Sequence, residues 1–263
     1  MTKVFLALFL CVSSLFGGDF YGIIIADTDV ENIGDYVYYD YLRMNRQMSK
    51  IARHLDRDFK EIMFIDDDVN DEEILTQIEA LTLNEDDIVF FYFSGHGQRS
   101  VQSQDDPWPL MKLGGRQAMN LSVMTAKLLE KNPRLVISVA DCCNNHLTVT
   151  PDELFFAQAK GESQGNSEKE LVRENTRKLF LNHRGLIMVS SSQPGEPAWS
   201  GLMGSYYTLY LTQALYYELR EDTTSWEIIF ERVTERLEDG QHPQYLIIPS
   251  NEEAQYFNKL MMN

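Results

Sequence analysis

Short apolar runs alternate along the chain with segments whose apolar residues recur every three or four positions. Six of these runs are predicted to be β-strands, at residues 21–26, 61–66, 88–94, 134–140, 185–191 and 244–249. Because the runs are apolar at nearly every position, they are typical of strands that are covered on both faces. Strands that alternate with helical segments predict an α/β fold with a mainly parallel sheet and helices on both sides of it.

Five segments between these runs show the periodicity of amphipathic helices. The clearest stripe has steps of three or four residues and consists of Val37, Tyr41, Met44, Met48, Ile51 and Leu55. Shorter stripes predict helices around residues 74–78, 121–128 and 207–215. A fifth helix is predicted from about residue 225 to residue 238, with Thr224 and Glu227 of the sequence TSWE as its capping box.

Two long segments, residues 98–118 and 144–180, fit no helix or strand pattern and are expected to be functional or mobile loops. The second loop is polar, and it is a candidate for self-cleavage because it contains the basic residues Lys160, Lys169, Arg173 and Arg177. No internal repeat divides the chain, so one domain with two large loops is the simplest organisation.

The charge of the chain limits its partners. Asp and Glu outnumber Lys and Arg by 40 to 23, which gives a formal net charge of −17, while 44% of the residues are hydrophobic. The hydrophobic content is sufficient for a core. This negative charge disfavours nonspecific binding to nucleic acid or anionic lipid, and it attracts basic peptides instead.

The first 18 residues have the layout of a secretory signal peptide. Lys3 precedes an apolar stretch from Val4 to Leu10, and small residues follow as far as Gly18. A buried first strand is the alternative reading, and a lipid anchor on Cys11 is disfavoured because the residues before it are not small. We therefore expect an exported protein, periplasmic or secreted, whose mature domain spans residues 19–263 and keeps no stable membrane anchor.

A histidine lies between two glycines directly after the third apolar run. In the stretch FFYFSGHGQ, residues 90–98, Gly95 and Gly97 flank His96. Glycines allow a tight turn and leave room beside the imidazole for a substrate. A histidine at a strand end can also be purely structural, so the motif alone does not define a function.

Two adjacent cysteines follow the next apolar run, in the sequence DCCNN at residues 141–145. In an open parallel sheet the carboxyl ends of the strands meet at one edge, so we expect Cys142 and Cys143 to lie near His96. An imidazole close to a thiol can help to form a nucleophilic thiolate. The pair therefore favours covalent catalysis by a cysteine.

A metal site is the other chemical reading, with His96, Cys142, Cys143 and His146 as potential ligands. Adjacent cysteines are an awkward pair on one tetrahedral ion, and no C-x-x-C or H-x-x-x-H spacing is present. The segment after the first strand contains no glycine-rich phosphate loop. We therefore predict no metal and no cofactor.

Four stretches together resemble the caspase-like cysteine peptidases, and within them the metacaspase and orthocaspase branch. FFYFSGHGQ resembles the histidine motif of the family, and LVISVADCCNN resembles its D-x-C motif. GLIMVSSSQPGEPAW with GSYYTLYLTQAL resembles the strand, specificity loop and helix after the nucleophile, and QHPQYLII resembles the closing strand. The resemblance covers roughly residues 19–250 and implies the three-layer caspase-hemoglobinase sandwich of six mainly parallel strands.

The resemblance also implies roles for individual residues. Cys143, which follows His96 by 47 residues, corresponds to the nucleophile, and the caspase histidine lies roughly 50 residues upstream of its cysteine. His96 corresponds to the acid/base residue, and the backbone N–H groups of Gly97 and Cys143 correspond to the oxyanion hole. The first specificity pocket is matched by Asp141 and Ser94, and more loosely by Asp40. Asp27 is a further candidate for this pocket.

These assignments imply an endopeptidase that cleaves peptides and proteins after Arg or Lys, because acidic residues stand where an aspartate-selecting caspase needs arginines. Calcium is expected to be dispensable, because the paired acids that calcium-dependent members carry are replaced by the sequence NLSV at residues 120–123. A caspase-like scaffold without turnover and a thiol hydrolase acting on a non-peptide bond are the alternatives.

Overall fold

The computed structural model describes residues 17–29, 32–66, 69–99, 106–114, 118–145, 166–237 and 240–261. Most of the predicted signal peptide, together with His146 and Lys160, lies outside these ranges. Among the described residues, no helix is both long enough and apolar enough to cross a membrane.

Six strands form the central sheet, in the spatial order β11-β8-β7-β3-β1-β2. Their bounds are β1 Phe20–Ala26, β2 Phe59–Ile65, β3 Ile88–Ser94, β7 Leu135–Asp141, β8 Gly185–Ser190 and β11 Gln244–Ile248. All neighbours are parallel except β11, which pairs antiparallel with β8. The prediction of six mainly parallel strands is confirmed, and each predicted range overlaps its observed strand.

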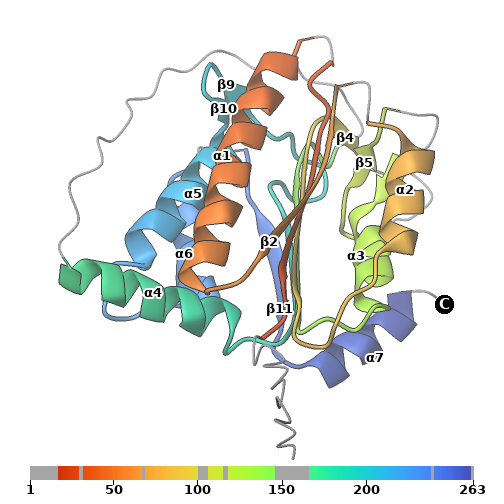
Figure 1. The fold of residues 1–263 in the computed structure, drawn as a ribbon. Helices are drawn as coiled ribbons and strands as arrows, with labels where there is room; N and C mark the ends of the chain where they lie inside the picture. The colour runs from red at the N-terminus through yellow and green to blue at the C-terminus, as the bar shows by residue number, and fades with distance from the viewer. Residues whose placement is uncertain are drawn as a thin grey trace, which may run out of the picture.

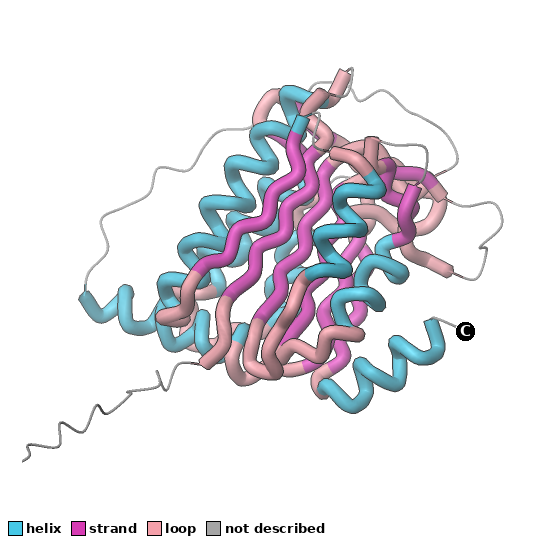
Figure 2. Tube along the Cα trace, turned by 45° about the vertical axis from the view of Figure 1, so that its right-hand side comes forward, coloured by secondary structure: helices cyan, strands magenta, loops and turns pink. Residues whose placement is uncertain are grey.

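Helices cover both faces of the sheet and make three layers (Figures 1 and 2). One face carries α1 Gly34–His54, α4 Asn166–Phe180, α5 Tyr206–Glu218 and α6 Trp226–Thr234. The other face carries α2 Asp71–Ala80, α3 Leu121–Leu129 and α7 Asn251–Met261. The fold is therefore the α/β sandwich that the sequence predicts.

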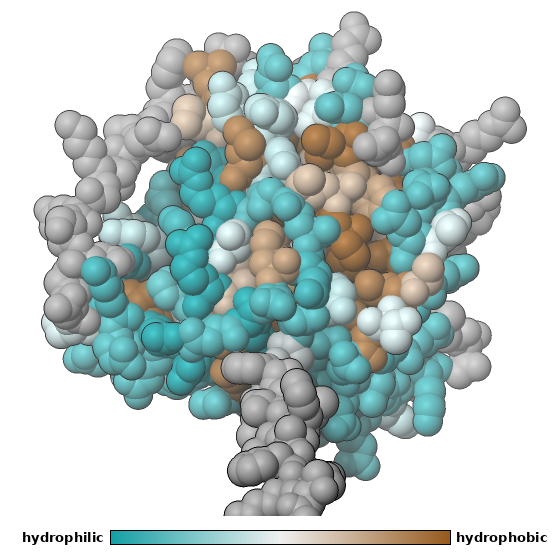
Figure 3. Space-filling model, viewed as in Figure 1, coloured by the Kyte–Doolittle hydropathy of each residue, from teal (hydrophilic) through white to brown (hydrophobic). Residues whose placement is uncertain are grey.

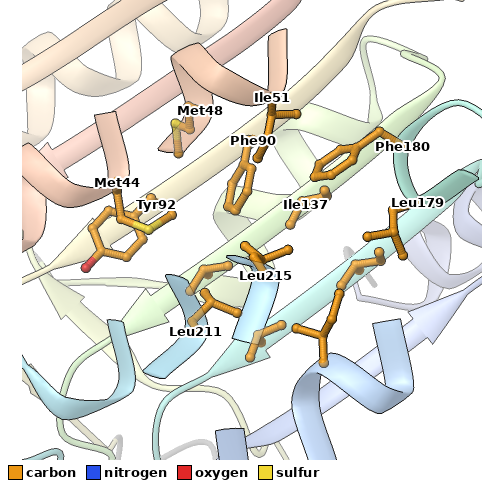
Figure 4. Close-up of a cluster of buried hydrophobic side chains, with 14 of the residues drawn as sticks. Met44, Met48, Ile51, Phe90, Tyr92, Ile137, Leu179, Phe180, Leu211 and Leu215 are labelled. Carbon is orange, nitrogen blue, oxygen red and sulfur yellow. The ribbon is translucent and has the colours of Figure 1, made fainter. Parts of the chain in front are cut away.

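The two faces of β3 explain why its sequence is apolar throughout. Phe90 and Tyr92 pack into the cluster beneath α1, α4, α5 and α6, while Phe91 and Phe93 pack into the cluster on the opposite face. Figure 4 shows part of the first cluster, in which Met44 and Met48 of α1 face these strands. Burying a side chain of this size contributes roughly 1.5–3 kcal/mol, so both layers stabilise the sheet.

The register of the sheet aligns the segments that carry the predicted chemistry. Ser94 at the end of β3 is paired with Asp141 at the end of β7, and also with Ala26 at the end of β1. The N–H of Gly95 donates to the carbonyl of Asp141 at 3.4 Å. His96 and Cys143 therefore emerge at the same edge of the sheet.

The structure corrects both loop predictions. Residues 98–118 contain parts of a small antiparallel sheet made of β4 Gly97–Gln98, β5 Leu110–Lys112 and β6 Ala118–Asn120. The prediction that residues 144–180 lack regular structure is wrong from residue 166 onward, where α4 begins. The buried face of α4 carries Asn175 and Thr176 between Val172 and Leu179, so polar residues interrupt the apolar stripe that reveals other helices.

Those polar side chains are satisfied within the layer, which is why they are tolerated. Asn175 donates to the carbonyls of Leu219 and Glu221 at 3.1 and 2.8 Å, and Thr176 donates to the carbonyl of Val172 at 2.6 Å.

The sequence analysis also did not predict helix α7.

Three of the four residues suggested for self-cleavage, Lys169, Arg173 and Arg177, lie in helix α4. Arg173 and Arg177 also form ion pairs with Asp56. A peptidase binds its substrate as an extended chain. Because these three residues are helical, they do not meet the condition for self-cleavage that the prediction assumed.

The cap of α6 also differs from its prediction. Its N-cap is Ser225, whose hydroxyl accepts from the N–H of Ile228 at 3.3 Å. Thr224 and Glu227 therefore do not form the capping box that the sequence suggested. The observed cap therefore lies one residue later than the sequence suggested.

Candidate active site

His96 is held at the carboxyl edge of the sheet by its own backbone. It follows β3 and precedes the short strand β4, and its carbonyl accepts from the N–H of Lys112 in β5 at 2.9 Å. The side chain is partly buried. Burial lowers the pKa of the imidazole below its ordinary value of 6.5, and the positive charge of Lys112 lowers it further. The neutral imidazole, which can accept a proton, is therefore favoured at neutral pH.

The two adjacent cysteines have different environments. Cys142 is 2% exposed and packs in the core on the side of α2 and α3, whereas Cys143 is partly exposed. A Cβ added to Gly97 would come within 2.4 Å of Cys142 Sγ and also within 2.4 Å of the carbonyl oxygen of Cys143. Only glycine permits this approach between the histidine and cysteine segments.

The thiol of Cys143 contacts the segment that follows β8. The N–H of Ala198 donates to Cys143 Sγ at 3.3 Å. Burial raises the pKa of Cys143 above its ordinary value of 9.0, and the Ala198 N–H opposes this rise because it favours the thiolate. The thiol form predominates at neutral pH, and a base is needed to activate it.

One pocket is lined by both residues of the candidate dyad. Its lining includes His96 and Cys143, as well as the three predicted pocket residues Asp141, Ser94 and Asp40. Gly97 and Asp27 are not part of the lining. Asp27 instead lies beside Gly95, where a Cβ on the glycine would be 3.3 Å from Asp27 Cβ. Of the predicted specificity residues, the structure therefore brings together all except Asp27.

Asp141 lines the pocket and is only 3% exposed. Its Oδ2 accepts from the N–H and the hydroxyl of Thr208 at 3.2 and 2.6 Å. Its Oδ1 is buried and lacks a well-aligned hydrogen bond from the described residues. Burial raises the pKa of Asp141, whereas hydrogen bonding with the side chains of Ser205, Thr208 and Ser191 opposes the rise. A ligand can therefore add a donor at Oδ1, the less well paired oxygen of this carboxyl.

Asp40 has a different set of partners, although it is equally buried at 1% exposure. Both of its oxygens accept from the N–H of Ser205, at 2.9 and 3.0 Å, and Ser94 donates to Oδ2 at 3.1 Å. Arg43 Nη1 lies 3.6 Å from Oδ1. Burial and the neighbouring Asp141 raise the pKa of Asp40, whereas these hydrogen bonds and Arg43 oppose the rise. Asp40 is therefore largely satisfied within the protein.

The pocket also contains residues that the sequence analysis did not assign. Tyr36 and Val37 come from the start of α1, and Ala198 and Trp199 come from the segment after β8. The aromatic residues near Asp40 in the sequence could have indicated that α1 lines the pocket. The same residues are equally typical of a helix face packed in the core.

The segment after β8 is fastened to the cysteine segment and to the start of β11. The carbonyl of Glu196 accepts from the N–H of Asn144 at 3.0 Å, and the carbonyl of Asn144 accepts from the N–H of Gly195 at 2.8 Å. The Glu196 carboxylate accepts from the N–H of His242 at 2.7 Å and lies 2.8 Å from His242 Nδ1. These bonds position Ala198 against Cys143.

The chain belongs to the caspase domain family, whose model matches residues 32–257. Membership in this family suggests a cysteine peptidase that acts on protein substrates. The histidine and cysteine stretches that define the candidate site lie within the matched residues.

Two solved structures are similar in fold. Protein GSU0716 from Geobacter sulfurreducens superimposes with a TM-score of 0.55 at 15% identity, over 87% of this chain and 92% of that one. Caspase-1 from Spodoptera frugiperda superimposes with a TM-score of 0.52 at 13% identity, over 88% of each chain. The fold is therefore caspase-like.

One sequence relative is much longer than this chain. A stretch of 175 residues, 64% of this chain, is 25% identical to the DNA replication ATP-dependent helicase/nuclease DNA2 of Saccharomyces cerevisiae. The match spans only 10% of that protein's length. We assign no function from it.

Proposed function

We propose that this protein is an endopeptidase of the metacaspase and orthocaspase branch, and that it cleaves after Arg or Lys with His96 and Cys143 as its catalytic dyad. The observation that carries the proposal is the single pocket lined by an imidazole, a thiol and two buried carboxylates. The thiol and the imidazole supply the covalent chemistry. The carboxylates supply a negative environment for a basic side chain.

In the proposed mechanism, His96 accepts the proton of the Cys143 thiol as Sγ attacks the scissile carbonyl carbon. The tetrahedral oxyanion is held by the N–H groups of Gly97 and Cys143, and each such donor is typically worth about 3–4 kcal/mol. The C–N bond then breaks, and His96 gives its proton to the leaving amine. A thioester on Cys143 remains.

Water completes the cycle. His96 removes a proton from a water molecule as the water oxygen attacks the thioester carbonyl. The C–S bond then breaks to release the carboxylic acid product, and His96 returns the proton to Cys143 Sγ. The pKa of His96 is lowered and that of Cys143 is raised, so both groups begin and end each cycle in their neutral forms. A separate third catalytic residue is not needed for these proton transfers.

A panel of fluorogenic peptides that differ only in the residue before the cut tests the proposal. We expect kcat/KM for the Arg and Lys peptides to exceed that for matched Asp and Asn peptides by about a hundredfold. A thiol-reactive peptide probe ending in arginine should label the protein with the same preference. Labelling without turnover would identify a caspase-like scaffold, and equal cleavage of Asp and Arg peptides would refute the specificity.

Peptide cleavage is expected to be independent of calcium. The residues at the start of α3 are Asn120 and Ser122, and both are engaged in capping: Asn120 accepts from the N–H of Ser122 at 2.8 Å. Neither is a carboxylate, whereas calcium binds preferentially to several carboxylate oxygens. We expect equal initial rates in chelator and in excess calcium. Activity that disappears in chelator and returns only with calcium would contradict this prediction.

A further inference from the structure

The second half of α1 carries a row of basic residues in an otherwise acidic protein. Arg46, Lys50, Arg53 and His54 lie on one side of the helix, because their spacings of four, three and one keep them within about 100° of arc. We call these four residues the basic stripe. No Asp or Glu occurs between residues 40 and 56, although the chain contains 40 acids and only 23 Lys and Arg.

Two further cations from neighbouring helices approach the stripe. Arg173 of α4 and Arg220, which follows α5, both act electrostatically on His54, as do Arg53 and Lys50. Arg220 also lies over the ring of Tyr216, 3.6 Å from its centroid. The stripe is therefore the centre of a larger positive surface at the junction of three helices. In Figure 3 the surface on this side of the molecule is mainly hydrophilic.

Acidic residues nearby neutralise only the outer members of this surface. Arg173 pairs with Asp56, and Arg220 pairs with Glu168 at 2.7 Å. Arg46, Lys50 and Arg53 form no ion pair within the described part of the chain, and all three are exposed. The positive charge of the stripe is therefore available to a ligand.

The stripe is not explained by the stability of the helix. Like charges three or four residues apart destabilise a helix, and the stripe contains two such pairs, Arg46 with Lys50 and Lys50 with Arg53. The negative end of the helix dipole offsets this cost for Arg53 and His54 in the last turn, but its effect does not extend to Arg46. Burial lowers the pKa of Lys50, and the positive charges of Arg46, Arg220 and Arg53 lower it further.

We propose that the basic stripe is a docking surface for an acidic segment of a partner protein. The three exposed cations span eight residues of helix, or about 10 Å, which matches a segment with a few closely spaced carboxylates. A longer polyanion such as nucleic acid would extend beyond the stripe onto a protein of net charge −17. A short acidic segment remains within about one screening length of the stripe, about 8 Å at physiological salt.

The candidate pocket is lined by Tyr36, Val37 and Asp40 in the first two turns of α1, whereas the basic stripe lies in its second half. Figure 1 shows the course of this helix. Asp40 lies in the pocket, and Lys50 lies ten residues further along the helix, or about 15 Å away. A segment docked on the stripe therefore leaves the pocket open to small peptides. The proposal is independent of the proposed peptidase activity, and it can be tested on a catalytically inactive protein.

The test is fluorescence anisotropy with a labelled oligoglutamate peptide, with an uncharged oligoglutamine peptide as the reference. We expect binding that weakens with salt, and a Kd that rises about tenfold in the double variant Lys50→Gln/Arg53→Gln. The matched control is Lys127→Gln/Lys131→Gln, which removes the same charge from the opposite helical layer, at α3 and just after it. This control should bind the peptide like the wild type.

His54 provides a second measurement at the same surface. Burial and the surrounding cations, Arg53 first among them, lower the pKa of His54. A bound carboxylate stabilises the imidazolium, so saturation with oligoglutamate should raise the pKa of His54 in an NMR titration, whereas His183 should be unaffected.

Four results would overturn the proposal. These are absence of oligoglutamate binding at low salt, an equal loss of binding in both double variants, tighter binding of an oligonucleotide of the same charge, and self-association that depends on Lys50 and Arg53.

Discussion

Replacing Cys143 with alanine is expected to lower kcat/KM for an Arg peptide by at least about a thousandfold, because loss of the nucleophile removes the covalent route entirely. Replacing Cys142 with alanine is expected to retain most of the activity. Both cysteines line the pocket, but Cys142 is 2% exposed and its thiol is directed toward Gly97, whereas Cys143 is partly exposed and its thiol accepts from the N–H of Ala198. Burial raises the pKa of Cys142 well above its ordinary value, which makes it a poor nucleophile.

The comparison requires both variants to fold. Cys142→Ala leaves a small cavity and should lower the thermal unfolding midpoint slightly, whereas Cys143→Ala, at a partly exposed position, should change it little. Iodoacetamide labelling followed by peptide mapping provides a second readout, with modification expected on Cys143 in the folded protein. Loss of activity in Cys142→Ala, with Cys143→Ala still active, would reverse the assignment.

The sheet and most of its helices could be predicted because the physical signal is local in the sequence. A strand that is buried on both faces needs apolar residues throughout, and the run around Phe90 meets that requirement. The stripe of Met44, Met48 and Ile51 likewise follows from a helix with one buried face. Neither pattern depends on distant parts of the chain.

Helix α4 could not be predicted in the same way. Its buried face includes Asn175, whose side chain is satisfied only by the carbonyls of Leu219 and Glu221 in a distant segment. A hydrogen bond across 44 residues leaves no periodic signal in the sequence. The small sheet of β4, β5 and β6 has strands too short to show alternation.

The part of the candidate site that lies at the ends of the strands could be predicted from the sequence. The parallel register places Ser94 beside Asp141, and the residues that follow them then share an edge. The contact between Ala198 and Cys143 depends instead on bonds from Glu196 to Asn144 and His242. Contacts between distant segments also decide how the two pocket acids, Asp40 and Asp141, differ. No local pattern in the sequence indicates such contacts.

This difference gives the second prediction, that Asp141→Asn lowers kcat/KM for an Arg peptide by about a hundredfold, which corresponds to about 2.7 kcal/mol. Asparagine keeps the size of the side chain and can still accept from Thr208 through its carbonyl oxygen. It removes the negative charge and replaces one of the two carboxylate oxygens, of which Oδ1 is the less well paired. The loss should be larger for Arg than for Lys peptides if the guanidinium bridges two acceptors.

The matched variant is Asp40→Asn, since Asp40 lines the same pocket at similar burial. Asp40 already accepts from the N–H of Ser205 and from Ser94, and Arg43 offsets its charge. We therefore expect Asp40→Asn to lower the unfolding midpoint and to reduce the Arg preference less than Asp141→Asn does. Asp141 forms no ion pair with the described residues, whereas a substrate guanidinium at Asp40 would approach Arg43.

The decisive quantity is the ratio of kcat/KM for Arg and Asn peptides in each variant, because a general loss of folding lowers both values equally. In Asp141→Asn this ratio should fall about a hundredfold, and in Asp40→Asn it should change by less than about tenfold. The opposite order would assign the substrate-binding role to Asp40 and would mean that the basic substrate displaces Arg43 from it. An unchanged ratio in both variants would remove the two carboxylates from the specificity pocket, because a buried charge that contacts a substrate guanidinium cannot be neutralised without cost.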